Sequence, residues 1–270
     1  MKIRIFAALL LFCMLAAFGG VQAYAEEESA ESVYVYVTVS DQNGTLVLAR
    51  EEVTVLDVNG DGVYTVDEAL YSAHEAKYAG GAEGYASETT DYGISMTKLW
   101  GIENGGSYGY YLNRVSPQSL ADEIKTGDEI DAFVYTDTET FSDTYCFFDE
   151  THVAVSGKEE LELTLYSYTY DENWNTVQTP VAGATVTIDG KETAFVTDEN
   201  GKVTLSFDGT GYCVVSAVKE GTALVPPVCA VAVSSNKLPA GDVSLVLWFS
   251  LIFVSCTAIY LIKKHARHAL

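Results

Sequence analysis

Apolar and polar residues alternate along most of the middle of the chain, a pattern typical of β-strands with one buried face. Residues 33–39, 161–165 and 184–188 show this alternation most clearly. A different spacing occurs at residues 66–77, where alanine and leucine recur at intervals of three and four and predict one helix. The pattern therefore predicts a mainly β protein with a small α+β domain.

The stretch between the two apolar ends of the chain is long enough for two domains of about 100 residues each. Strand patterning lapses at residues 149–160, which we take as the domain boundary. We expect an α+β domain at residues 32–148 and a small all-β sandwich at residues 153–235.

The N-terminal end has the organisation of a secretory signal peptide. Lys2 and Arg4 precede an apolar run at residues 5–18, which is shorter than the ~20 residues that a membrane-spanning helix needs. Ala23-Tyr24-Ala25 then provides a small-x-small cleavage site. Residues 1–25 are therefore expected to be removed on export, and an uncleaved N-terminal anchor is the alternative.

The C-terminal end predicts a transmembrane helix. Residues 243–262 carry no charge and are long enough to cross ~30 Å of hydrocarbon at 1.5 Å per residue. Lys263, Lys264 and Arg267 follow within residues 263–270, and basic residues just beyond a span stay in the cytoplasm. We expect a single-pass protein with an extracellular N-terminus. A buried core helix is the alternative, but no segment follows that could cover it.

The charge distribution agrees with an exported domain. The chain has a formal net charge of −23, and all 38 Asp and Glu residues lie between residues 26 and 242. Such an acidic surface repels nucleic acid and anionic lipid headgroups, and it favours divalent cations. A nucleic-acid partner is therefore excluded.

Residues 57–68 match the 12-residue calcium-binding loop at every specified position. Calcium prefers six to eight oxygen ligands, which the loop supplies at alternating positions. The expected ligands are the side chains of Asp57, Asn59, Asp61, Thr65 and Glu68 and the carbonyl of Val63. A strand rather than a helix precedes the loop, so it resembles a dockerin-like or isolated calcium loop more than a paired EF-hand. We predict a structural Ca²⁺, and an acidic surface turn is the alternative.

The second domain contains two strong turn signals. Asp189-Gly190 follows an alternating stretch, and Thr197-Asp198-Glu199-Asn200-Gly201 precedes another. Together with the flanking Pro-Val-Ala-Gly-Ala-Thr-Val-Thr-Ile stretch, they resemble the carboxypeptidase-regulatory or prealbumin-like modules of bacterial surface proteins. The resemblance implies a β-sandwich that serves as a spacer or stalk.

The first domain resembles a bacterial family related to the C-terminal domain of transcobalamin. The resemblance rests on a glycine-aromatic strand at residues 105–113 and on Lys125-Thr126-Gly127-Asp128-Glu129-Ile130, which leads into a final strand at residues 131–135. It implies a β-grasp-like sheet and contact with a small ligand such as a corrinoid. No ligand-binding residues carry over to this sequence.

The segment before the C-terminal span resembles the sorting signal of Gram-positive surface proteins, which reads Leu-Pro-x-Thr-Gly. Here the sequence is Leu238-Pro239-Ala240-Gly241-Asp242. The Thr–Gly bond that a sortase cleaves has no counterpart, so action by a sortase is doubtful. We expect the span to persist as a membrane anchor, with attachment to the cell wall as the alternative.

The remaining reactive residues do not form a catalytic motif. Cys213 and Cys229 flank a turn and are compatible with a disulfide or with two buried thiols. His74 is expected on the solvated face of the predicted helix, and neither it nor His152 lies beside a nucleophile motif. We therefore do not expect an enzyme.

These features together predict a membrane-anchored cell-surface protein of a Gram-positive bacterium. We expect a non-enzymatic, calcium-stabilised module for binding or adhesion, with an extracellular glycan or protein as its partner. A surface receptor for a small ligand such as a corrinoid is the alternative.

Overall fold

The structure is a computed structural model that describes residues 32–156, 159–173 and 175–235. The expected signal peptide, the expected transmembrane helix at residues 243–262 and the tail at residues 263–270 lie outside the described residues. In the part of the chain that is described, no helix is long and apolar enough to cross a membrane. The described residues are mainly β, as the alternating pattern predicts.

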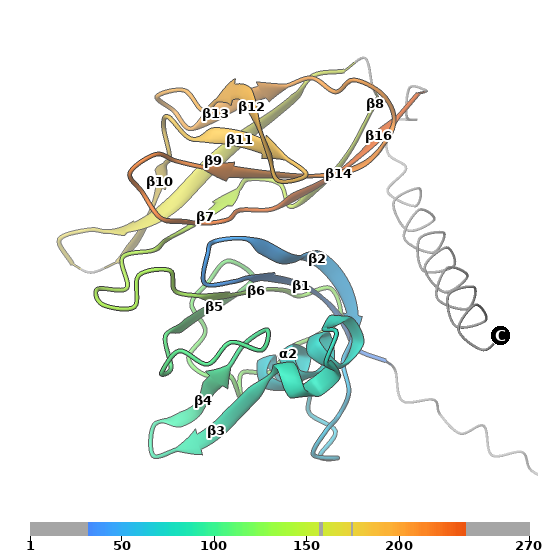
Figure 1. Cartoon of the computed structure of the whole chain (residues 1–270), viewed down its shortest axis with the longest axis vertical. Helices are drawn as coiled ribbons and strands as arrows, with labels where there is room; N and C mark the ends of the chain where they lie inside the picture. The colour runs from blue at the N-terminus through green and yellow to red at the C-terminus, as the bar shows by residue number, and fades with distance from the viewer. Residues whose placement is uncertain (1–31, 157–158, 174, 236–270) are drawn as a thin grey trace, which may run out of the picture. The chain divides into compact units, whose positions relative to one another are not determined.

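The first domain is built on a four-stranded sheet with the order β2-β1-β6-β5 (Figure 1). The bounds of its strands are Tyr34–Ser40 for β1, Leu46–Thr54 for β2, Tyr108–Leu112 for β5 and Glu129–Val134 for β6. The two outer pairs, β1–β2 and β5–β6, are antiparallel. The central pair, β1 and β6, is parallel, so the chain must cross over between them.

The crossover contains helix α2 (Val66–Lys77), which confirms the predicted helix. The 3₁₀ helix η1 (Gly81–Gly84) and the hairpin of β3 (Ala86–Thr90) and β4 (Gly93–Lys98) follow it. One face of the sheet buries its side chains with those of α2 in a shared core. Fully buried members of this core include Val35, Val37, Val39, Ala69, Leu70, Ala73 and Ile130.

The second domain has two sheets that enclose one core. The first sheet contains β7 (Thr144–Phe148), β9 (Leu161–Tyr170), β10 (Thr176–Pro180), β13 (Lys202–Leu205) and β15 (Leu224–Val225). The second contains β8 (His152–Ser156), β11 (Thr185–Ile188), β12 (Lys191–Val196), β14 (Gly211–Val218) and β16 (Cys229–Ser234). Leu163 of β9 and Val186 and Val231 of the other sheet are fully buried in the common core. The domain is therefore a β-sandwich.

Strand β7 belongs to this sandwich, because it pairs with β9 and β15. The range expected for the first domain, 32–148, thus includes one strand of the second domain. The reason is that residues 144–148 are apolar at four of five positions, and periodicity does not indicate which sheet such a strand joins.

Both turn signals of the second domain form the expected turns. Ile188 pairs with Lys191, which leaves Asp189 and Gly190 as a two-residue hairpin loop with φ values of 49° and 74°. In the other turn, Asp198 accepts hydrogen bonds from the backbone N–H groups of Asn200 and Lys202. These local bonds close the turn before β13.

Candidate functional site

The candidate calcium loop at residues 57–68 connects β2 to α2, and a strand rather than a helix precedes it. Its first acid, Asp57, is turned onto the loop backbone. Oδ1 accepts the N–H of Gly60 at 2.7 Å, and Oδ2 accepts the N–H of Gly62 at 2.9 Å. The two glycines have φ values of 76° and 78°, which L-residues rarely adopt, so both are required by the backbone.

The next two predicted ligands repeat this arrangement. Asn59 Oδ1 accepts the N–H of Asp61 at 2.9 Å, and Asp61 Oδ1 accepts the N–H of Val63 at 2.8 Å. Asn59 Nδ2 also donates to Asp61 Oδ2 at 3.0 Å. The oxygen-bearing side chains at alternating positions are therefore folded inward along one side of a tight loop.

Glu68 links the end of the loop to its beginning. Its side chain is buried, and Oε1 accepts the N–H of Val58 at 2.9 Å. Oε2 accepts the N–H of Thr65 at 3.2 Å, while Thr65 Oγ1 accepts the N–H of Glu68, forming a capping box at the start of α2. The carboxylate thus reaches back across the loop, in the direction that calcium binding requires.

The predicted ligands suit a hard cation such as calcium, since each side chain among them offers an oxygen atom. In the described residues, however, no three His, Cys, Asp or Glu side chains gather tightly enough to hold a metal ion. The acids at positions 57, 61 and 68 bind backbone N–H groups instead. The six proposed ligands therefore remain a prediction.

The loop is attached to the body of the first domain through a buried segment. Ile124 N donates to Tyr64 O at 2.9 Å, and Asp67 N donates to Leu120 O at 2.8 Å. The side chain of Leu120 is fully buried in the core of this domain. A change in the conformation of the loop is therefore expected to affect the stability of α2 and of the core of the first domain.

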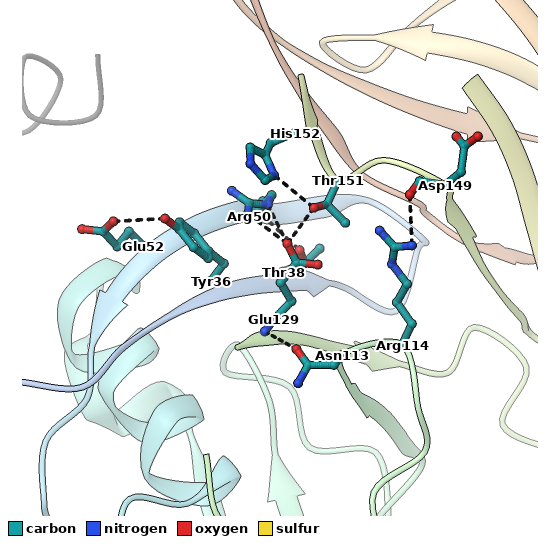
Figure 2. A network of polar contacts seen from close by, with 10 residues as sticks. All are labelled: Tyr36, Thr38, Arg50, Glu52, Asn113, Arg114, Glu129, Asp149, Thr151 and His152. Atoms are coloured by element: carbon teal, nitrogen blue, oxygen red, sulfur yellow. Dashed lines mark hydrogen bonds and ion pairs between the residues drawn. The ribbon is translucent and has the colours of Figure 1, made fainter. Parts of the chain in front are cut away.

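A second candidate site lies where the two domains meet, and the sequence did not indicate it. Figure 2 shows its polar contacts, which we call the junction network. At its centre, Glu129 of β6 accepts hydrogen bonds from Arg50 of β2 and from Thr151, which lies between β7 and β8. The ion pair measures 2.9 Å, and the Arg50 and Glu129 side chains are 12% and 23% exposed.

A β-bulge aims Arg50 into this network. The pairing of β1 with β2 shifts register between Val37 and Val39, so β2 has an extra residue there. Arg50 has a φ of 48°, and its N–H is bonded to Thr38 Oγ1. Its guanidinium lies 3.9 Å from the centre of the Tyr36 ring, which adds a cation–π contact.

A tight turn supplies the other arginine of the network. Leu112 bridges Val115, and Asn113 and Arg114 between them have φ values of 50° and 66°. Asn113 Oδ1 accepts the N–H of Glu129 at 2.9 Å, which holds the turn against β6. Arg114 then donates to the Asp149 carbonyl of the second domain at 3.2 Å.

An aromatic cluster fills the rest of the junction. The rings of Tyr111 and Tyr145 stack with centroids 3.5 Å apart, and Phe133 and Phe147 belong to the same cluster. Gly109 lies opposite Phe133 in the sheet, and a Cβ at this glycine would overlap the Phe133 ring. The second domain thus covers the face of the β2-β1-β6-β5 sheet that does not contact α2.

Little space remains inside the junction. A cavity of about 30 Å³ lies between Tyr36, Arg50, Asp131 and Tyr145, which is room for about one water molecule. A more open hollow of about 270 Å³ lies beside Lys219 and Leu224. In the described residues, every buried side-chain nitrogen or oxygen has a hydrogen-bond partner.

The environment of His74 differs from the expectation. Instead of facing solvent, its side chain is fully buried among Tyr78, Tyr85 and Trp100. Nε2 accepts the backbone N–H of Trp100 at 2.9 Å, so the proton is on Nδ1 and is donated to Leu70 O at 2.6 Å. Burial lowers the pKa of His74 below its usual value. The spacing of apolar residues along the helix did not indicate that β4 and the turn after it would cover the side of α2 that carries His74.

The cysteines are free thiols in the described residues. Cys213 pairs with Val231 and Cys229 pairs with Val215, so the two cysteines are diagonal rather than opposite in the sheet. Diagonal Cα atoms are ~7–8 Å apart, beyond the usual span of a disulfide. Burial raises the pKa of Cys213 to about 11 and of Cys229 to about 12. The structure thus favours two free thiols, of which Cys229 is buried and Cys213 is partly exposed.

No model of a protein family matches the sequence, and no curated protein matches it. Among solved structures, the chain is similar to the D0-D1 domain of intimin, at 15% sequence identity and a TM-score of 0.26. The match covers 73% of this chain and 95% of that chain. A likeness this low transfers neither residues nor function.

Proposed function

We propose that the chain is a membrane-anchored cell-surface protein for binding or adhesion, with the β-sandwich as a stiff spacer. The observation that carries this proposal is the closed junction. Ligand and catalytic sites occur preferentially in clefts between domains. Here that position is filled by the Arg50–Glu129 ion pair and by the Tyr111–Tyr145 stack. The outer surfaces are left for contact with a partner, and no enzymatic role is proposed.

The topology of the first domain supports a β-grasp-like assignment. Two antiparallel pairs, β1–β2 and β5–β6, meet at the parallel contact of β1 with β6, and the crossover helix packs on one face. This is the arrangement that the transcobalamin-like resemblance implies. The small cavities near the junction, about 30 and 270 Å³, fall below the ~300–1,000 Å³ of small-molecule pockets.

Calcium has a structural role in this proposal. The alternating oxygens of Asp57, Asn59 and Asp61 and the returning carboxylate of Glu68 support such a site. A bound ion would neutralise these acids and stabilise the start of α2. Extracellular modules bind calcium at ~10⁻⁴–10⁻³ M, which suits an exported domain.

The anchor and its orientation rest on the sequence. The uncharged residues 243–262 and the basic residues behind them support a lasting single-pass anchor with the two domains outside. A fully exposed Tyr92 at the tip of the β3–β4 hairpin is the residue that we nominate for partner contact. Tyrosine at such a position combines a large apolar surface with a polar tip.

The test uses intact Gram-positive cells that display the full chain. Adhesion to immobilised glycans and extracellular proteins is measured for the unmodified chain, for Tyr92→Ala, and for a matched control, Tyr212→Ala, whose tyrosine is 56% exposed in the second domain. We expect saturable adhesion that falls at least severalfold in Tyr92→Ala alone, with equal surface display. Binding of a free corrinoid without any adhesion would replace this proposal with the receptor.

A further inference from the structure

Glu129 connects the two domains through a single carboxylate oxygen. Oε1 accepts Arg50 Nε at 3.1 Å and Nη2 at 2.9 Å, both within the first domain. The same oxygen accepts Thr151 Oγ1 at 2.6 Å from the second domain. The bonds from Arg50, inside the first domain, and the bond from Thr151, between the domains, therefore share one oxygen atom, as Figure 2 shows.

We propose that Glu129 couples the two domains thermodynamically, so that they unfold as one cooperative unit. This inference goes beyond the proposed function, because it holds whether or not the chain binds a partner or calcium. Domains joined only by a linker unfold separately, and coupling requires an interface whose loss destabilises both sides.

The linker itself is ordered, which keeps the two surfaces in register. Asp143 accepts the N–H groups of Thr136 at 2.8 Å and Asp137 at 2.9 Å. Asp137 in turn accepts bonds from Thr140 and Ser142. These hydrogen bonds fix the conformation of residues 136–143, but none of them involves a residue in the core of either domain.

The negative charge of Glu129 compensates the positive charge of Arg50 in the junction network. Arg50 is mostly buried and would lose its only ion pair in the described residues if Glu129 were neutralised. Removing one partner of a buried pair leaves an uncompensated charge, which costs more than the pair itself contributes. The other charged groups nearby do not take over, since Arg114 donates to the Asp149 carbonyl and Asp131 accepts from Tyr145.

Thr151 provides a variant that isolates the contact between domains. Thr151→Val keeps the shape of the side chain and leaves the Arg50–Glu129 pair intact, but it removes the hydroxyl that reaches Glu129. Glu129→Gln keeps the size of the side chain and removes the charge. A matched control is Glu162→Gln, which removes the charge of an exposed pair with Lys202 measuring 2.7 Å.

The experiment is scanning calorimetry of the full chain in detergent micelles, with hydrogen exchange at β1 and β16 to assign each transition to a domain. We expect one transition in the unmodified chain and in Glu162→Gln. We expect Glu129→Gln to separate the domains into two transitions, the first-domain midpoint falling by at least ~2–4 °C. In Thr151→Val, we also expect the amides of β1 and those of β16 to exchange at different rates, because the two domains then open separately.

Two results would overturn the inference. Two independent transitions in the unmodified chain would mean that the junction does not couple the domains. A single transition with synchronous exchange in both variants would mean that Glu129 is not the coupling residue. If Glu129→Gln fails to fold, Thr151→Val decides the matter alone.

Discussion

Tyr145 of β7 donates its hydroxyl to Asp131 Oδ2 of β6 at 2.6 Å, and this bond joins the two domains beside the junction network. The two residues are 14 positions apart, and the linker between their strands folds back to bring them together. Burial raises the pKa of Asp131, and the bond from Tyr145 opposes that change only in part.

This relationship predicts a pH dependence for Asp131→Asn. An acid whose pKa is raised on folding keeps its proton longer in the folded chain, so its contribution to stability falls as the pH rises from about 4. The amide oxygen of asparagine still accepts the Tyr145 hydroxyl. We expect the variant to gain in free energy of unfolding relative to the unmodified chain as the pH rises above about 4, by about 1.4 kcal/mol per unit of pKa difference.

Urea denaturation at several pH values measures this gain. Glu52→Gln is the control, because Glu52 is an exposed acid that accepts the Tyr36 hydroxyl on the same sheet. A constant difference between Asp131→Asn and the unmodified chain at every pH would show that the carboxyl is not destabilised by burial.

Removal of calcium is predicted to destabilise the first domain. At ten times its dissociation constant, a ligand that binds only the folded state adds about 1.4 kcal/mol to the free energy of unfolding. We therefore expect a higher melting temperature of the full chain in millimolar calcium than in chelator, and no such difference in Asp57→Ala.

The control for this prediction is Asp41→Ala. Asp41 also accepts backbone N–H groups, from Asn43 and Thr45, but it lies in the β1–β2 turn outside the calcium loop. This variant should lower the melting temperature while retaining the response to calcium. Equal melting in calcium and chelator for the unmodified chain would refute the predicted site.

His74 is predicted to make the first domain sensitive to mild acid. Its pKa is lowered on folding, so its contacts contribute fully above the unfolded value of about 6.5 and are lost as the pH falls below it. His74→Phe should flatten this part of the stability profile. It should also cost about 1–3 kcal/mol at pH 7, because the Trp100 N–H is left without an acceptor.

Chemical denaturation between pH 5 and 8 measures both effects. His152→Asn is the comparison. Partial burial lowers the pKa of His152 as well, but its side chain is exposed at the junction, so we expect its loss to change the profile less. An identical slope in His74→Phe and in the unmodified chain would mean that the buried imidazole does not titrate in this range.

Gly109→Ala is predicted to disrupt the aromatic cluster. The added methyl group would overlap the Phe133 ring, and overpacking of this kind costs typically about 1–3 kcal/mol. The double variant Gly109→Ala/Phe133→Leu should recover part of the loss, since leucine leaves room for the methyl. Thermal melting compares them, and a double variant less stable than the sum of the two single changes would contradict the steric explanation.

Local chemistry allowed several elements to be predicted without the structure. The helix at residues 66–77 and the hairpin at Asp189-Gly190 form as expected, because propensity, capping and turn residues act over a few neighbouring positions. The match of residues 57–68 to a calcium loop rests on the same local chemistry, and calcium binding itself stays a prediction. The sheet to which β7 belongs could not be predicted, since one apolar strand suits either sheet.

The sequence by itself determined the mainly β character, and it led us to expect two domains, a calcium loop, an export signal and an anchor. Only the tertiary structure decided that His74 is buried, that Cys213 and Cys229 are diagonal, and that Glu129 meets both Arg50 and Thr151. The physical reason is range. Periodicity reports which face of an element is apolar, whereas a bulge, a register and a folded linker decide which distant side chains share that face.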